Sequence, residues 1–363
     1  GYEAYTPSTL VRLSPLELIQ STKVILPILL FGSQHLGVYY GIGTGAAEAA
    51  GTVDEIATAL DFDPNKLQVF PLLRSFYFVN WHYVGNAPPR PDPTLGNNFW
   101  ATEVAYSDGK FYLSYSVGHE DKNHQLRVAQ SDTPIGPYED IGEPLTDLNT
   151  CAFASDPHPF RNDNGQWYLF YARHLLDTEG GVGVGTALVV DLLQNMTKLA
   201  GLERVFLGAR CHWQGVLANR LMYGKVFDWH TLEGPCVRKH QGRYYCFYSG
   251  GCWQTEYYGV DYGVADSIMC PYYDAGKEAG PRVLKSVCGY VEGPGHNSIV
   301  FSPYGKTEYI AYHAWTTEVG HICLDKLLCT VDGPRCEGPT WTKQTIDVNK
   351  SYQKIENLQE TKS

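Results

Sequence analysis

The chain has 363 residues, of which 44% are hydrophobic and 18% charged. Its 26 Tyr, 37 Gly and 21 Pro suit strands and turns, which excludes a disordered, collagen-like or coiled-coil protein and argues against an all-helical one. The 28 basic and 39 acidic residues give a net charge of −11, so we expect neither nucleic acid nor a membrane surface as a partner.

Membrane insertion and secretion leave little trace in the sequence. The longest apolar run, Val24–Phe31, is interrupted by Pro27 and is far shorter than the ~20 residues of a membrane helix. No signal peptide is visible, which predicts a cytoplasmic location. Removal of a signal peptide before Gly1 would instead make the protein secreted.

One pattern occurs five times along the chain: a Gly turn, an aromatic pair or near-pair, and then alternating aromatic and small residues. Each copy has the period-2 alternation of a strand after a turn, which predicts a β-hairpin. The copies start at Gly37, Gly109, Gly165, Gly242 and Gly305, and their equivalent tyrosines are Tyr40, Tyr112, Tyr168, Tyr245 and Tyr309.

Five such hairpins predict an all-β chain that folds as one five-bladed β-propeller over residues 1–363. We place blade 1 at roughly residues 20–70 and the last strand at roughly 320–345, followed by a short C-terminal tail. Two β-sandwich domains are the alternative. Outer strands are predicted at Leu126–Ser131, Gly183–Val190 and Tyr258–Ala265, and peripheral helices at Pro15–Ile19 or Val53–Leu60.

The strand before each Gly turn should be the innermost strand of its blade. Counting about 12 to 14 residues back from each repeat tyrosine gives one predicted channel position per blade. Equivalent positions on innermost strands meet at one end of the channel, so their side chains should share a pocket. The five positions are Leu26, Trp100, Asp156, Glu233 and His296.

A pocket with two carboxylates and an aromatic platform is typical of glycoside hydrolysis. One carboxyl group, kept protonated by burial, donates its proton to the leaving oxygen, and the other activates water or supports the acid. Asp156 and Glu233 are the candidate catalytic residues, and Trp100 is a candidate sugar platform. His230 precedes Glu233 by three residues, which makes it a candidate at the pocket rim.

Several segments together resemble glycoside hydrolase family 43 between about residues 69 and 340. They are Phe99-Trp-Ala-Thr-Glu-Val, Asp156-Pro-His-Pro-Phe, Glu233-Gly-Pro-Cys-Val and Gly293-Pro-Gly-His-Asn-Ser. The resemblance implies a five-bladed propeller and an inverting hydrolase of arabinose- or xylose-containing plant polysaccharides. It implies Glu233 as the general acid, Asp156 as the residue that tunes the acid's pKa, and His296 facing a central ion, often calcium, or an ordered water.

The sequence departs from that family at the general base, which is an Asp on blade 1. The matching position holds Leu26, followed by the expected Pro27, and no Asp precedes Asp54. Three explanations stay open: a lost base, a base supplied from elsewhere, or a misread sequence over roughly residues 5–75. Glu17, Asp92 and Glu103 are the carboxylates to test as a substitute, although Asp92-Pro93 fits an inter-blade loop better.

The sequence therefore predicts a glycosidase that releases arabinofuranosyl or xylosyl units from plant oligosaccharides. An α-L-arabinofuranosidase is the first choice, with a β-xylosidase or an endo-1,5-α-arabinanase as alternatives. The hypothesis from another class is a catalytically silent, glycan-binding propeller, which Leu26 supports.

Overall fold

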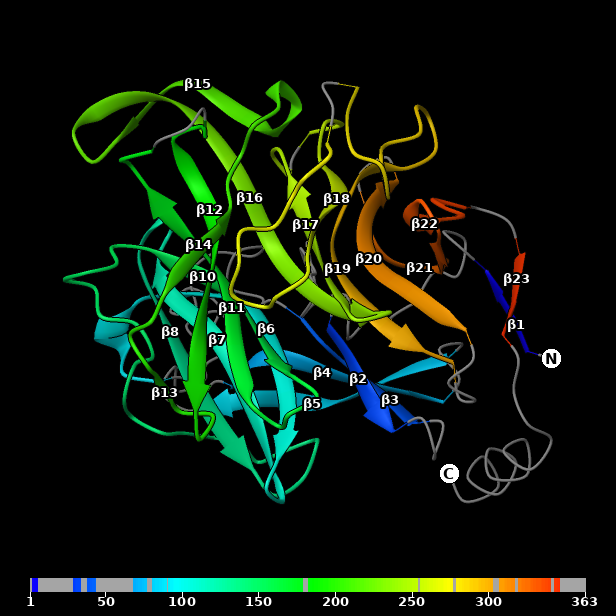
Figure 1. Ribbon diagram of the computed structural model, residues 1–363. Helices are drawn as coiled ribbons and strands as arrows, with labels where there is room; N and C mark the ends of the chain where they lie inside the picture. Colours follow the sequence, from blue (N-terminus) through cyan, green and yellow to red (C-terminus); the bar gives the residue numbers. More distant parts are fainter. Residues whose placement is uncertain are drawn as a thin grey trace.

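The computed structural model describes residues 2–5, 29–33, 38–43, 68–76, 80–89, 91–178, 182–253, 255–276, 279–302, 307–316, 319–340 and 343–346. Leu26, Glu17, both predicted helices and the Gly37 and Gly305 turns lie outside these residues. Apart from two short 3₁₀ helices, the regular elements in this part of the chain are strands, which confirms the all-β prediction (Figure 1). None of its helices has the length and hydropathy to span a membrane.

The elements in chain order are β1 (Tyr2–Tyr5), β2 (Leu29–Ser33), β3 (Val38–Ile42), β4 (Gln68–Phe76), β5 (Asn80–Pro89), η2 (Pro93–Leu95), β6 (Asn98–Ser107), β7 (Lys110–His119), β8 (Lys122–Ser131), β9 (Glu139–Asp140), β10 (Ala154–Arg161), β11 (Trp167–Leu175), β12 (Gly185–Gln194), β13 (Lys198–Leu199), β14 (Arg204–Leu207), η3 (His212–Gln214), β15 (Gly215–Met222), β16 (Lys225–His240), β17 (Arg243–Gly250), β18 (Gly259–Ala265), β19 (Glu292–Phe301), β20 (Glu308–Thr316), β21 (Val319–Thr330), β22 (Gly333–Cys336) and β23 (Lys343–Ile346).

The strands form antiparallel sheets that follow the chain order. Strands β2–β5, β6–β9 and β19–β22 make three four-stranded sheets, and β1 pairs with β23. A nine-stranded sheet contains two antiparallel runs, β10–β12 and β16–β18, with β13 and β14 added to β12 and β15 added to β16. The predicted outer strands at residues 126–131, 183–190 and 258–265 correspond to β8, β12 and β18.

The two runs of the nine-stranded sheet join where β12 and β16 briefly run parallel. Gly185 lies opposite His230, and Thr186 lies opposite Thr231. A Cβ atom on Gly185 would lie only 2.0 Å from the His230 carbonyl oxygen, so the close approach requires glycine. This contact joins the two runs into one sheet.

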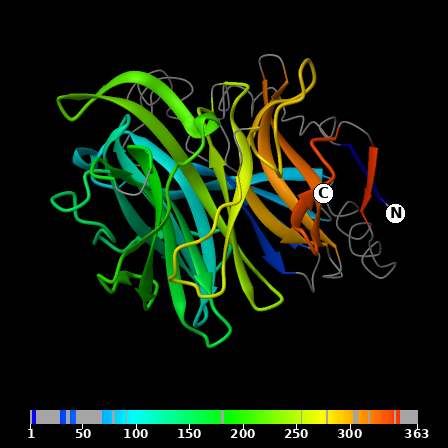
Figure 2. The same cartoon turned by 45° about the horizontal axis from the view of Figure 1, so that its top comes forward.

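The first strands of these runs lie around a common centre. Strand β2 contacts β6, β6 contacts β10, β10 contacts β16, β16 contacts β19, and β19 contacts β2. The Tyr39 hydroxyl in β3 donates to the Phe301 carbonyl at the end of β19 over 2.8 Å, which ties the first sheet to the last. In both ribbon views the long β15–β16 hairpin projects beyond the sheets (Figures 1 and 2).

Buried apolar side chains fill the spaces between successive sheets in four clusters. In one of them, Phe70 of β4 packs edge-on against Tyr115 of β7, with ring centroids 5.6 Å apart. In another, Phe170 of β11 meets Phe206 of β14, with centroids 5.3 Å apart. Packing face to face in this way leaves the polar residues of the first strands to line the centre.

Candidate active site

A narrow pocket lies where strands β6, β10, β16 and β19 meet. Each strand contributes consecutive residues to its wall. The lining residues are Ala101, Thr102, Glu103, Asp156, Pro157, Gly234, Pro235, His296, Asn297 and Ser298.

The four strands share one local irregularity at this pocket. Each has a register shift in its pairing with the next strand, and the residue within it has a left-handed φ: 45° at Ala101, 56° at Asp156, 58° at Gly234 and 48° at His296. Such β-bulges turn a strand and redirect a side chain. The bulges therefore place these residues at equivalent positions.

Two of the predicted channel positions, Asp156 and His296, carry the left-handed φ of their bulges, whereas on β6 and β16 it falls on Ala101 and Gly234, one residue after Trp100 and Glu233. In all four strands the left-handed residue comes four residues before the partner of the repeat tyrosine. The turns between these strands and the strands that carry the tyrosines differ in length. A fixed number of residues counted back from the tyrosine therefore does not always reach the left-handed residue. The same count from Phe31, the partner of Tyr40, gives Pro27 rather than Leu26, and both lie outside the described residues.

Asp156 is buried at the centre of the pocket, with 8% of its surface exposed. Its Oδ2 accepts a hydrogen bond of 2.8 Å from the backbone N–H of Gly234. Burial raises the pKa of Asp156 from 3.8 to about 6, against the opposing effect of the hydrogen bonds from Gly234 and Ser155. Asp156 can therefore gain or lose a proton close to neutral pH.

Glu233 immediately precedes Gly234 on β16. It is therefore adjacent in sequence to the residue whose backbone N–H binds Asp156. Its half-buried carboxylate accepts a hydrogen bond from the hydroxyl of Tyr258, which follows Glu233 by one hairpin. The pKa of Tyr258 is well above its usual value because of burial and then the charge of Glu233, with a smaller effect of Asp156. Both carboxylates therefore lie close to one buried phenol.

His296 lines the pocket beside Gly234. A Cβ atom on Gly234 would lie 3.2–3.3 Å from the His296 ring, so the ring packs directly on that backbone. The backbone N–H of His296 donates to the Ser249 hydroxyl over 2.6 Å. Burial lowers the pKa of His296 from 6.5 to about 3, which keeps the imidazole neutral at physiological pH.

Glu103, which lines the pocket from β6, is hydrogen-bonded to His158 of β10. His158 Nδ1 lies 2.8 Å from Glu103 Oε2, and both side chains are largely buried. Burial raises the pKa of Glu103, and the neighbouring His158 opposes that effect. Glu103, a candidate substitute base, therefore lies in the pocket wall and is held there by His158 of β10.

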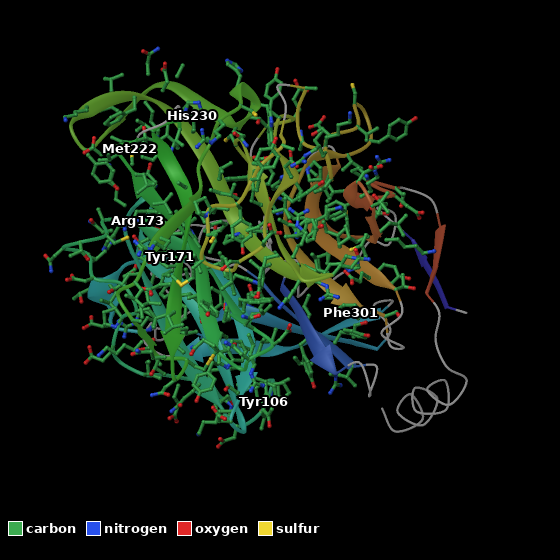
Figure 3. All side chains as sticks on the ribbon, in the orientation of Figure 1. Tyr106, Tyr171, Arg173, Met222, His230 and Phe301 are labelled. Atoms are coloured by element: carbon green, nitrogen blue, oxygen red, sulfur yellow. The ribbon has the colours of Figure 1, made fainter. Side chains whose placement is uncertain are left out.

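Trp100, His230 and Glu233 lie outside the set of residues that lines the pocket, although Glu233 immediately precedes the lining residue Gly234. Trp100 stacks on His124, with ring centroids 3.9 Å apart. The His230 ring packs against Gly183, and Figure 3 shows it on the side of Met222 in the β15–β16 hairpin, far from Tyr106. On β6 the bulge turns Ala101, the residue after Trp100, into the pocket wall.

Asp92, another substitute base candidate, is the N-cap of η2 in the connection between β5 and β6. Its exposed Oδ1 accepts from the Thr94 backbone N–H over 2.9 Å. The predicted loop location of Asp92-Pro93 is therefore confirmed, and Asp92 does not line the pocket.

Sequence reasoning missed Tyr258, His158 and Asn297 as parts of this site. Asn297 follows His296, and His158 follows Asp156 by two residues, so the bulge register could have indicated both. Tyr258 had no such signal, because it precedes an outer strand and reaches Glu233 only through the pairing of the sheet.

Comparison with known proteins gives the family. The model for glycosyl hydrolases family 43 matches residues 58–332, which is most of the chain. The chain therefore belongs to glycosyl hydrolases family 43.

Its relatives carry several sugar specificities. A β-D-galactofuranosidase of Aspergillus niger is 31% identical over 61% of this chain and 55% of its own length. An extracellular endo-α-(1→5)-L-arabinanase of Bacillus subtilis is 27% identical over 72% of this chain and 73% of its own. An exo-α-(1→5)-L-arabinofuranosidase of Streptomyces avermitilis is 23% identical over 60% and 43%. The chain spans about half the length of the first and third of these relatives.

Solved structures support the fold. A thermostable family-43 glycoside hydrolase superposes with a TM-score of 0.71 at 23% identity, covering 89% of this chain and 96% of its own. The α-L-arabinanase of Cellvibrio cellulosa, solved with arabinohexaose, has a TM-score of 0.64 at 18% identity, covering 87% and 96%.

Proposed function

We propose that the protein is an inverting glycosidase that releases arabinofuranosyl or xylosyl units from plant arabinan or arabinoxylan oligosaccharides. The observation that carries the proposal is the pairing of two carboxylates through Gly234, whose N–H binds Asp156 and whose neighbour is Glu233. Glu233 is the general acid, and Asp156 holds its proton until the transition state. Names of relatives that act on arabinan and xylose-containing substrates support the sugar class.

The proposal includes a five-bladed propeller as the scaffold. The closed ring of contacts among β2, β6, β10, β16 and β19 supports it, as does the antiparallel run that each strand starts. In such a ring the innermost strands meet at one pocket, which is the arrangement that paired carboxylates require. The short parallel joint between β12 and β16 then links two neighbouring blades.

Release of nitrophenol from aryl α-L-arabinofuranoside, β-D-xyloside and β-D-galactofuranoside tests the activity. The third substrate is included because of the similarity to the Aspergillus enzyme. We expect turnover of the arabinofuranoside or the xyloside, with inversion at the anomeric carbon visible by NMR. Turnover of none of them, together with binding of arabino-oligosaccharides, would support a silent glycan-binding propeller. Cleavage in the middle of long arabinan chains would support the endo-acting alternative.

The silent alternative rests on the blade-1 position, where neither Leu26 nor Pro27 can accept a proton. An inverting enzyme needs a second carboxylate, about 6.5–9.5 Å from the acid, to activate water. If the base is lost, azide should rescue cleavage of an activated glycoside and give an inverted glycosyl azide. Leu26→Asp and Pro27→Asp, made separately, show which position restores hydrolysis. Peptide mass mapping of this region comes first, since an Asp found there would exclude the lost base.

A calcium ion beside His296 is a further part of the proposal. The Asn297 amide and the Thr102 hydroxyl line the same pocket, are buried, and have no hydrogen-bond partner among the described residues. Amide and hydroxyl oxygens of this kind are suitable calcium ligands, and water molecules would complete the coordination shell. The neutral His296 imidazole can face such an ion. However, the described residues contain no cluster of three or more His, Cys, Asp or Glu side chains that could hold a metal. The proposed ion is therefore held mainly by water and neutral groups.

Chelation tests the calcium proposal directly. A ligand that binds only the native state stabilises it by mass action, so a chelator should lower the melting temperature and added calcium should restore it. The Asn297→Leu variant should lose this response to calcium. An unchanged melting temperature across the chelator titration would instead indicate that water fills the pocket.

A further inference from the structure

His158 makes two hydrogen bonds that define its tautomer. Its Nε2 lies 3.0 Å from the backbone nitrogen of Val237, which can only donate, so Nε2 carries no proton. The proton of the neutral ring is therefore on Nδ1, which donates to Glu103 Oε2 over 2.8 Å. His158 thus bridges β6 and the backbone of β16.

The bridge reaches β16 just after the candidate acid. The ladder between β16 and β17 is interrupted between Glu233 and Cys236, so pairing within the sheet does not fix this stretch of backbone. Two acceptors from β10 bind the backbone here: Asp156 takes the N–H of Gly234 within the interrupted stretch, and His158 takes the N–H of Val237, one residue after pairing resumes at Cys236. They bracket the bulge from both ends.

We propose that Glu103 and His158 are positioning residues for Glu233. Glu103 holds His158 in the tautomer that accepts from Val237, and His158 fixes the bulge from which the Glu233 side chain projects. Loss of the hydrogen bond from Val237 to His158 lets the carboxyl group of Glu233 move away from the leaving oxygen, although the carboxyl group itself is still present. The inference rests on the proposed acid role of Glu233.

Two substitutions separate the two ends of the bridge. In His158→Gln the amide oxygen can occupy the Nε2 position and still accept from Val237. In His158→Asn the shorter amide can occupy the Nδ1 position and still donate to Glu103, but Val237 loses its acceptor. His240→Asn, a half-buried histidine at the far end of β16, is the matched control.

The readout is the ratio of kcat/KM on an unactivated oligosaccharide to kcat/KM on the aryl glycoside of the same sugar. Only the former needs full protonation of the leaving group, so a displaced acid lowers the ratio, whereas partial unfolding lowers both values equally. For His158→Asn we expect a roughly 10- to 100-fold loss on the oligosaccharide and less than about threefold on the aryl glycoside. The ratios of His158→Gln and Glu103→Gln should lie between those of His158→Asn and the wild type. The ratio of His240→Asn should equal that of the wild type.

Equal losses on both substrates in His158→Asn, or a wild-type ratio, would overturn the inference. If Glu233→Gln itself fails to lower the ratio, the proposed acid role is wrong instead. Should His158→Asn not fold, His158→Gln and Glu103→Gln provide the same ratio. If the wild type proves catalytically silent, amide hydrogen exchange at Gly234 and Val237 tests the bracket: faster exchange in His158→Asn than in His240→Asn supports it, and equal exchange overturns it.

Discussion

Strand β10 places the carboxylate of Asp156 in the pocket wall, and strand β16 places that of Glu233 next to the lining residue Gly234, yet the two side chains have different surroundings. Asp156 occupies the left-handed position of its bulge, is almost fully buried, and accepts from a backbone N–H. Glu233 lies one residue before the left-handed position of its own bulge, is half-buried, and accepts from a phenol. Paired carboxylates in unequal environments separate into different roles, as general acid–base catalysis requires.

The largest expected effect comes from Glu233→Gln, which removes the proton donor and keeps the shape. General acid catalysis is worth roughly 10²–10⁴-fold, so activity on substrates with poor leaving groups should fall by about that factor. Activated aryl glycosides need little protonation and should lose much less. Steady-state kinetics on both substrate types provide the measurement, and an equal loss on both would leave Glu233 only a structural role.

Asp156→Asn should change the pH dependence of the reaction more than the structure. The charge of Asp156 favours the protonated form of its neighbour, so its removal should move the basic limb of the pH–rate profile to lower pH by about one to two units. Turnover should fall, though less than in Glu233→Gln. A pH–rate profile that keeps its basic limb would remove Asp156 from the catalytic set.

The same substitution should stabilise the fold at high pH. The pKa of Asp156 is about 6 in the native state, above the usual 3.8, so the native state loses stability as pH rises through this range. An Asn side chain tolerates the left-handed φ and can still accept from Gly234. Urea unfolding should therefore show Asp156→Asn more stable than the wild type by up to about 3 kcal/mol at pH 8 and equal to it at pH 4. Greater stability of the wild type at both pH values would contradict this.

Gly234→Ala tests the backbone link between the two carboxylates. A side chain at a left-handed φ costs about 1–2 kcal/mol, and here the added methyl group would also press on the His296 ring at 3.2–3.3 Å. Gly242→Ala is the matched control, because its φ of 80° is also left-handed but nothing lies within 4 Å of the added Cβ. We expect a larger loss of melting temperature, and a loss of activity, only in Gly234→Ala. Equal effects of the two substitutions would show that the contact with His296 is unimportant.

Much of the scaffold could be predicted from local sequence. The turns at Gly109, Gly165 and Gly242 lie between β6 and β7, β10 and β11, and β16 and β17, where the repeat predicted them. Period-2 alternation and turn residues act over a few neighbours, so they are visible in one segment at a time. Asp156 and His296 were found for the same reason, since the repeat fixes the approximate position of the innermost strand.

Sequence alone therefore determined the strands, their turns and the carboxylates available to the pocket. Only the tertiary structure decided which residue of each strand faces the centre. Bulges and turns of variable length change the number of residues between the repeat tyrosine and the position that faces the centre. It also decided the partners of these residues. Gly234 binds Asp156, Val237 binds His158, and Tyr258 binds Glu233 across strands or hairpins far apart in sequence, and such contacts exist only once the sheets pack around one pocket.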